Sequence, residues 1–132
     1  MNWKNYFRIL LVDDQDDILK KLVKRFRQMG FQDISLAKNG KEAVELIKRI
    51  VPDLTIVNRD MQVKDGYKTI KAIRENGFDC LIVTLTEKEN GPGKDKLSER
   101  WSGNIIRKPI NHDFEKQLFT ILDSKGYIPT AQ

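Results

Sequence analysis

The 132-residue sequence is poor in the residues that build disulfides and metal clusters, with one cysteine, Cys80, and one histidine, His112. A single cysteine excludes an internal disulfide and a zinc site of several cysteines, and a single histidine excludes a histidine-rich metal site. No apolar run approaches the roughly 18 residues that a membrane span needs. The first five residues include no apolar signal core, so we expect no secretion by that route and a cytoplasmic location.

Charged residues, by contrast, are abundant: they make up 33% of the chain, against 39% hydrophobic residues, and the formal net charge is +5. This balance is typical of a globular protein, and the length fits one domain, which we place at residues 1–126 with a tail at 127–132. A basic surface can bind nucleic acid. However, the lysines and arginines are spread over the polar faces of the expected helices and are not interleaved with aromatic residues. We therefore expect solvated charge and no nucleic-acid site.

Short apolar runs alternate with apolar stripes at helical spacing along the whole chain. The runs predict buried strands at 7–12, 34–37, 54–57, 81–85 and 105–106. The stripes predict helices at 17–29, 43–50, 67–75 and 92–100, with a last helix between Asn111 and Gly126. Asn39 and Gly40 are expected to form a turn before the second helix. This alternation favours an α/β fold in which parallel strands are joined by right-handed crossovers and helices cover both faces of the sheet.

Ligands of such sheets bind at the carboxyl ends of the strands, and polar residues gather there. The residues found at these ends are Asp13, Asp14, Asn58, Asp60, Thr86 and Lys108. Two adjacent carboxylates repel each other unless a cation is near, and hard oxygen ligands suit Mg²⁺. A lysine or a threonine hydroxyl opposite them can hold a phosphoryl oxygen. The alternative for Asp13 and Asp14 is a helix N-terminus with favourable dipole contacts, and the alternative for Asp60 is a solvated loop residue.

In these motifs the sequence resembles the receiver domain of bacterial two-component response regulators. The pieces that carry the resemblance occur in family order over residues 7–124: Ile9–Asp14, Asn39–Ala43, Pro52–Leu54, Met61 with Asp65–Gly66, Leu85–Thr86 and Lys108–Pro109. The resemblance implies a flavodoxin-like, doubly wound, five-stranded parallel sheet in the order 2-1-3-4-5. It also implies that Asp13 and Asp14 hold Mg²⁺, that Thr86 and Lys108 contact a phosphoryl group, and that the Lys108–Pro109 bond is cis.

The same resemblance places Asn58 where the family has the aspartate that accepts phosphate. An amide has no anionic oxygen with which to attack a phosphohistidine, and the alternative for Asn58 is a turn residue that ends the third strand. Glu87 stands after the threonine, where the family has a small residue, and Ile105 stands at the switch aromatic position. We therefore expect Mg²⁺ binding to be weak or absent, through the two adjacent aspartates and the Asp60 region.

These observations predict a signalling module of a two-component or phosphorelay system that acts by protein–protein interaction, without aspartate phosphorylation, and is not an enzyme. The expected partner is a histidine kinase or a downstream output protein, docked on the face of the fourth helix, the fifth strand and the last helix. The alternative is an ordinary phospho-accepting receiver whose acceptor aspartate has been replaced by Asn58. A small flavodoxin-like enzyme or nucleotide binder is a third hypothesis, which the lack of a glycine-rich loop after the first strand opposes.

Overall fold

The computed structural model describes residues 2–58, 66–86 and 104–127. In chain order the elements are η1 (Trp3–Asn5), β1 (Arg8–Val12), α1 (Asp16–Gln28), β2 (Asp33–Ala37), α2 (Gly40–Ile50), β3 (Leu54–Asn58), α3 (Gly66–Glu75), β4 (Leu81–Thr86), β5 (Ile105–Arg107) and α5 (His112–Ser124). All five predicted strands are present, and four of the five predicted helices lie in the described ranges. The helix expected at 92–100 lies outside the described residues.

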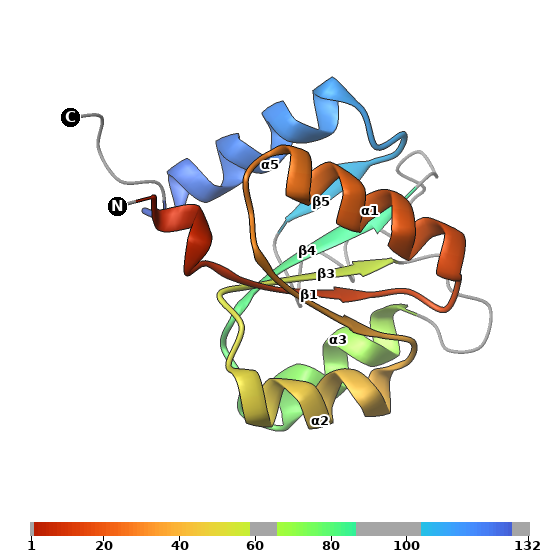
Figure 1. The fold of residues 1–132 in the computed structure, drawn as a ribbon. Helices are drawn as coiled ribbons and strands as arrows, with labels where there is room; N and C mark the ends of the chain where they lie inside the picture. Colours follow the sequence, from red (N-terminus) through yellow and green to blue (C-terminus); the bar gives the residue numbers. More distant parts are fainter. Residues whose placement is uncertain (1, 59–65, 87–103, 128–132) are drawn as a thin grey trace.

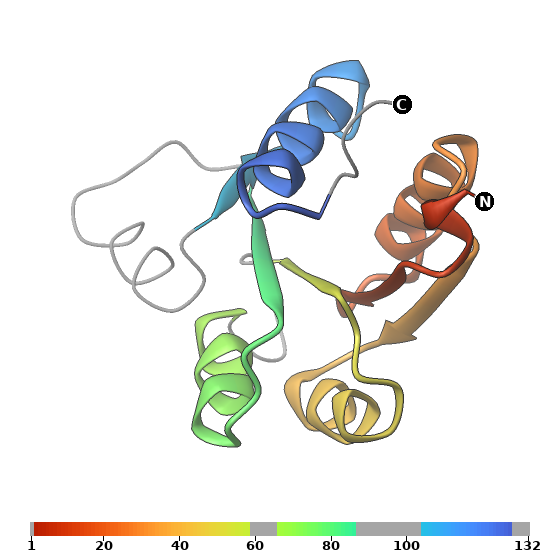
Figure 2. The same ribbon diagram turned by 90° about the vertical axis from the view of Figure 1, so that its left-hand side faces the viewer.

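The five strands form one parallel sheet in the order β2-β1-β3-β4-β5, which confirms the predicted topology. Helices α1 and α5 cover one face of the sheet, and α2 and α3 cover the other (Figure 1). The view in Figure 2 shows the sheet between these two helical layers. The crossovers that contain α1, α2 and α3 therefore each pass over a face of the sheet, as the alternation of strands and helices requires.

Burial on both faces explains why the central strands are continuous apolar runs. In β1, Ile9 and Leu11 pack into the core under α1 and α5, while Leu10 and Val12 pack into the core under α2 and α3. All four side chains are at most 1% exposed. A half-exposed strand would alternate apolar and polar residues, so the unbroken run is the signature of a strand with helices on both sides.

The start of α2 differs from the prediction at Asn39 and Gly40. These residues do not form a separate turn: Asn39 is the N-cap of α2, and its Oδ1 accepts the backbone N–H of Glu42 at 2.9 Å. Gly40 is the first residue of the helix and lies against α3, where a Cβ would meet the Thr69 hydroxyl at 3.0 Å. The side chain of Asn39 satisfies a helix N–H that has no partner within the helix, so the helix begins three residues earlier than its first apolar residue suggests.

The chain's two described ends meet in one aromatic cluster, which we define as Trp3, Phe7, Phe31 and Tyr127. Its rings pack mostly edge to face, with centroids 5.3 to 5.8 Å apart. Beside it, the Lys4 ammonium donates a hydrogen bond to the backbone oxygen of Met29 at 2.7 Å. Tyr127, which the sequence assigned to the tail, is therefore part of the packed domain.

At the C-terminal end of α2, the C-cap residue Val51 adopts a left-handed conformation with φ 47° and is exposed. It is the one non-glycine residue with positive φ among the described residues. A β-branched side chain is unfavourable in this region of φ/ψ space, so the C-terminus of α2 is strained.

In the described part of the chain, no helix has the length and apolar character needed to cross a membrane; the cytoplasmic location stays a prediction.

Candidate functional site

The carboxyl ends of the strands bring Asp13, Asn58, Thr86 and Lys108 to one edge of the sheet. Asp13 follows β1 and its N–H donates to the backbone oxygen of Ala37 on β2. Asn58 and Thr86 are the last residues of β3 and β4, one residue beyond the predicted strand ends. The backbone N–H of Lys108 donates to the backbone oxygen of Thr86 at 2.8 Å. This bond holds the lysine beside the end of β4. The Lys108–Pro109 peptide is cis, as the resemblance implied.

Asn58 joins the acidic and basic sides of this site. Its Nδ2 donates to Oδ2 of Asp13 at 2.8 Å, and its Oδ1 accepts from the ammonium of Lys108 at 3.4 Å. Asn58 is only 2% exposed. The amide therefore presents its N–H to the Asp13 carboxylate and its oxygen to the Lys108 ammonium. If the amide were rotated by 180°, its oxygen would face the carboxylate and its N–H groups would face the ammonium, and both contacts would be unfavourable.

Asp13 is fully buried, and its two oxygens both accept hydrogen bonds. Oδ1 accepts the backbone N–H of Gln15 at 3.0 Å, and Oδ2 accepts the Asn58 amide. Burial raises the pKa of the Asp13 carboxyl above its ordinary value, and the neighbouring charge of Asp14 adds to the rise. The two hydrogen bonds and the positive charge of Lys108 act in the opposite direction.

The backbone of Gln15 is a contributor that sequence reasoning missed. Its main-chain N–H holds the Asp13 carboxylate in place, and a main-chain donor leaves no signal in the side-chain pattern. It is also the N-cap residue of α1, without a side-chain capping bond. Asp16 and Asp17 lie in the first turn of α1, so they supply the favourable charge at the helix N-terminus, and Asp13 and Asp14 precede the helix.

The remaining predicted residues lie at different depths. Asp14 is half-buried, and although the residue has other interactions, its Oδ1 atom is buried and accepts no hydrogen bond. Thr86 is fully buried, and Ile105 is half-buried at the start of β5, where it pairs with Thr84. Asp60 and Glu87 lie outside the described residues.

The residues of this site match only part of what a divalent cation needs. Two adjacent carboxylates supply the hard oxygens that suit such a cation, and Oδ1 of Asp14, the residue beside Asp13 in the sequence, is buried. Asn58, however, directs its N–H rather than its oxygen at Asp13. Among the residues that the structure describes, no cluster of three or more His, Cys, Asp or Glu side chains could hold a metal ion. The site therefore offers part of a magnesium ligand set, with an amide in contact with one of the two acids.

Residues 9–120 match the family model of the response regulator receiver domain. The chain is 32% identical over 116 residues to the probable C4-dicarboxylate response regulator DctR of Priestia megaterium, covering 86% of this chain and 50% of that protein. It is 26% identical over 131 residues to a protein-glutamate methylesterase/protein-glutamine glutaminase of Halalkalibacterium halodurans, covering 95% of this chain and 38% of that protein. The chain thus spans half or less of the length of these relatives.

Solved structures show the same fold. The chemotaxis protein CheY4 of Vibrio cholerae superposes with a TM-score of 0.75 at 24% identity, covering 89% of this chain and 96% of that chain. A chain of the CheX-CheY-BeF3-Mg+2 complex from Borrelia burgdorferi superposes with a TM-score of 0.77 at 22% identity, covering 88% and 89%. The family match spans most of the sequence and includes β2 to β5, β1 from Ile9 onward, and the residues at the carboxyl ends of the strands. This chain belongs to the response regulator receiver domain family.

Proposed function

We propose that this receiver domain signals by binding a protein partner and does not depend on phosphorylation of an aspartate. In this proposal Asn58 occupies the position at which phospho-accepting receivers have their aspartate. The observation that carries the proposal is the 2.8 Å hydrogen bond from Asn58 Nδ2 to Asp13. It shows an amide, held in a fixed orientation, in the centre of the acidic site.

The chemistry of an amide supports this assignment. Phosphoryl transfer to a receiver forms a bond from a carboxylate oxygen to phosphorus, and the leaving group departs as that bond forms. The Asn58 side chain has no carboxylate, its nitrogen lone pair is delocalised, and its oxygen is neutral. The preceding residue, Val57, offers no hydroxyl as a substitute. The domain is accordingly proposed to bind rather than to catalyse.

Weak Mg²⁺ binding is part of the same proposal. Both oxygens of Asp13 already accept hydrogen bonds, so a cation that binds Asp13 must displace or share them. A neutral amide also contributes less to cation binding than a third carboxylate. When bound, Mg²⁺ would neutralise the adjacent acids. The residues proposed to hold it are Asp13 and Asp14, with Asp60 from the segment outside the described residues.

The proposed partner is a histidine kinase or a downstream output protein that docks on the face of the fourth helix, β5 and α5. Within this face the structure describes β5 and α5, and the expected helix at 92–100 lies outside the described residues. One similar solved chain comes from a complex of two proteins, CheX and CheY. That assembly supports a protein partner for this fold, and the specific face stays a prediction.

A second candidate is the ordinary phospho-accepting receiver in which Asn58 has replaced the acceptor. The specific observation that favours it is the completeness of the surroundings: Asp13, Thr86 and Lys108 all gather at the strand ends around Asn58. In the first candidate the pocket has diverged, and Glu87 opposes the incoming phosphoryl trianion. In the second candidate, the site lacks only a carboxylate oxygen, which the amide NH2 of Asn58 replaces, to accept a phosphoryl group.

Intact-mass spectrometry after incubation with acetyl phosphate and Mg²⁺ tests both candidates. The wild-type protein should stay unmodified, because Asn58 offers no nucleophile. Phosphorylated wild-type protein, with the label mapped to the pocket, would contradict both candidates.

The Asn58→Asp variant then separates them. Rapid gain of one phosphoryl group by this variant would favour the replaced acceptor. Slow modification that becomes rapid only when Glu87→Ala is added would support the diverged pocket. Asn5→Asp is the matched control, because it makes the same chemical change at an exposed position and should gain no mass.

A further inference from the structure

An apolar groove lies between α1 and β2, away from the strand ends that hold Asn58. Its volume is about 520 Å³. Leu19 and Val23 of α1 line it on one side, and Leu36 of β2 lines it on the other. Leu36 is 45% exposed, which is unusual for a leucine in a strand of a sheet with helices on both faces. The helix therefore leaves part of the apolar surface of β2 uncovered.

The outer edge of β2 is open along this groove. β2 is the first strand of the sheet and pairs only with β1 in the part of the chain that the structure describes. Ile34 and Leu36 point toward α1, because alternate residues of a strand share a face, whereas Ala37 packs under α2. Exposed edges are usually protected by lysine, proline or a bulge. The interior of β2 has none of these, since its sequence between Asp33 and Ala37 is Ile-Ser-Leu.

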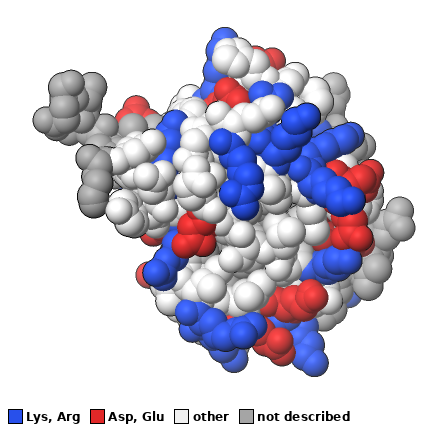
Figure 3. Space-filling model, viewed as in Figure 1, with Lys and Arg blue, Asp and Glu red and all other residues white. Residues whose placement is uncertain are grey.

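Two lysines of α1 border the groove. Lys20 and Lys24 line it, are exposed, and make no ion pair with any carboxylate among the described residues. They lie four residues apart, one above the other on the same face of α1. In Figure 3 lysines and arginines gather over α1, and the surface beside them is mostly uncharged. The groove therefore combines an apolar floor with a positive border.

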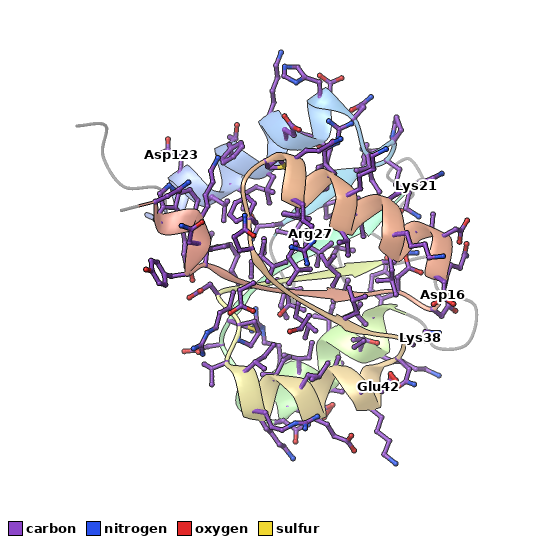
Figure 4. All side chains as sticks on the ribbon, viewed as in Figure 1. Asp16, Lys21, Arg27, Lys38, Glu42 and Asp123 are labelled. Carbon is purple, nitrogen blue, oxygen red and sulfur yellow. The ribbon has the colours of Figure 1, made fainter. Side chains whose placement is uncertain are left out.

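The acidic residues at one end of the groove are already engaged. Asp16 forms an ion pair with Lys38 at 2.8 Å, and the backbone N–H of Lys38 donates to Glu42 at 3.2 Å. Figure 4 shows Asp16, Lys38 and Glu42 together where α1 and α2 begin. The hydrogen bond and charge of Lys38 lower the pKa of Asp16, and those of Asp16 raise the pKa of Lys38. The charge of Lys20, one helical turn from Asp16, also lowers the pKa of Asp16, so Asp16 balances part of that charge, whereas Lys24 lies farther along the border.

We propose that this groove binds an extended acidic segment of a partner protein, which adds to the open edge of β2 as a sixth strand. Backbone groups of the segment pair with β2, apolar side chains enter the groove over Leu36, and acidic side chains reach Lys20 and Lys24. A second copy of this chain fits less well, because it would bring the same lysines together and each copy carries a net charge of +5. The inference concerns a different surface from the Asn58 site and does not depend on the proposed function.

A synthetic peptide of sequence SETVTVTES, capped at both ends and carrying a fluorophore, is a suitable probe. In a strand its valines and glutamates share one face, and its threonines share the other. One control peptide has lysine in place of both glutamates. A second has proline in place of the central threonine, which removes a backbone donor. Fluorescence anisotropy should show saturable binding of the first peptide and binding at least about tenfold weaker for both controls.

Variants of the full chain locate the binding. Leu36→Asp should weaken it by about tenfold or more, because it removes an apolar contact and adds a like charge. Lys24→Glu should weaken it as well. Lys48→Glu is the matched control, since it makes the same charge change at an exposed position of α2 and should leave the affinity within about twofold. All three positions are exposed, and thermal unfolding checks that each variant folds.

Four outcomes would overturn the proposal. No saturable binding of the acidic peptide would do so, as would equal weakening by Lys48→Glu and Lys24→Glu, which would indicate attraction by net charge alone. Tight binding of the proline peptide would exclude strand addition. Analytical ultracentrifugation that shows a dimer of the wild-type chain, abolished by Leu36→Asp, would assign the groove to a second copy.

Discussion

Replacing Asn58 by aspartate exchanges the N–H that Asn58 donates to Asp13 for a second carboxylate oxygen. In the wild-type protein this contact is 2.8 Å and fully buried. In the variant, two oxygens of like charge would face each other over the same distance. Lys108, whose ammonium lies 3.4 Å from the Asn58 oxygen, would gain a charged partner and offset part of the repulsion.

The balance of these effects sets the expected loss of stability. A hydrogen bond to a charged group contributes about 1.5–3 kcal/mol. Two unit charges about 4 Å apart repel by roughly 4 kcal/mol at an effective dielectric constant near 20. The new attraction to Lys108 has a similar size and the opposite sign. We therefore expect Asn58→Asp to lower the free energy of unfolding by about 2 kcal/mol, or the Tm by roughly 8 °C for a chain of this length.

Calorimetric melting in EDTA at pH 8 measures this loss. Millimolar Mg²⁺ should restore much of it, because a cation between the carboxylates removes their repulsion. Lowering the pH should also reduce it, because two carboxylates in contact share a proton once one of them is protonated. Asn5→Asp, at an exposed position, should melt like the wild type under all three conditions. An Asn58→Asp variant that melts at or above the wild-type Tm in EDTA would refute this account of the site.

Three further predictions concern other described residues. Val51→Gly should raise the free energy of unfolding by about 1 kcal/mol, because glycine adopts the φ of 47° without strain; a lower Tm would contradict this. Asn111→Ala should lower it by about 1 kcal/mol in urea unfolding, because the Asn111 side chain accepts two N–H groups at the start of α5, whereas Asn111→Ser should retain most of the stability. Asp13 has a pKa raised above its ordinary value of 3.8, so its contribution is largest below pH 3.8 and is lost as the pH rises through the folded-state pKa. Relative to Asp13→Asn, wild-type stability in EDTA should therefore fall across that window, and a rise would contradict the assignment.

The fold was predictable because burial on both faces leaves a strong pattern. Ile9–Val12 cannot be the half-exposed strand of an antiparallel sheet, and once the strands are parallel their carboxyl ends must share one edge. That reasoning brought Asp13, Asn58 and Lys108 together from positions far apart in the sequence. The helix boundaries were less predictable, because a cap such as Asn39 is also a common turn residue and the two readings differ only in backbone geometry.

The hydrophobic pattern of the sequence does not predict which side chains contact each other. The sequence identified Asn58 as an amide in an acidic site, but its orientation depends on Lys108 and Asp13 being on opposite sides of it. The exposure of Leu36 was also not predictable, because Ile34 and Leu36 are typical residues of a buried strand. Only the position of α1 relative to the sheet edge shows that the helix leaves Leu36 uncovered.

The aromatic cluster of Trp3, Phe7, Phe31 and Tyr127 has a consequence for experiments that attach reporters to this domain. It holds both ends of the described chain at the same pole, opposite the strand ends that carry Asp13 and Asn58 (Figure 1). A donor and an acceptor fluorophore fused before Trp3 and after Tyr127 would report on each other and on the integrity of that cluster. The strands, α1 and α5 separate these fluorophores from the site, so a label that reports on the site directly must be placed at the other pole.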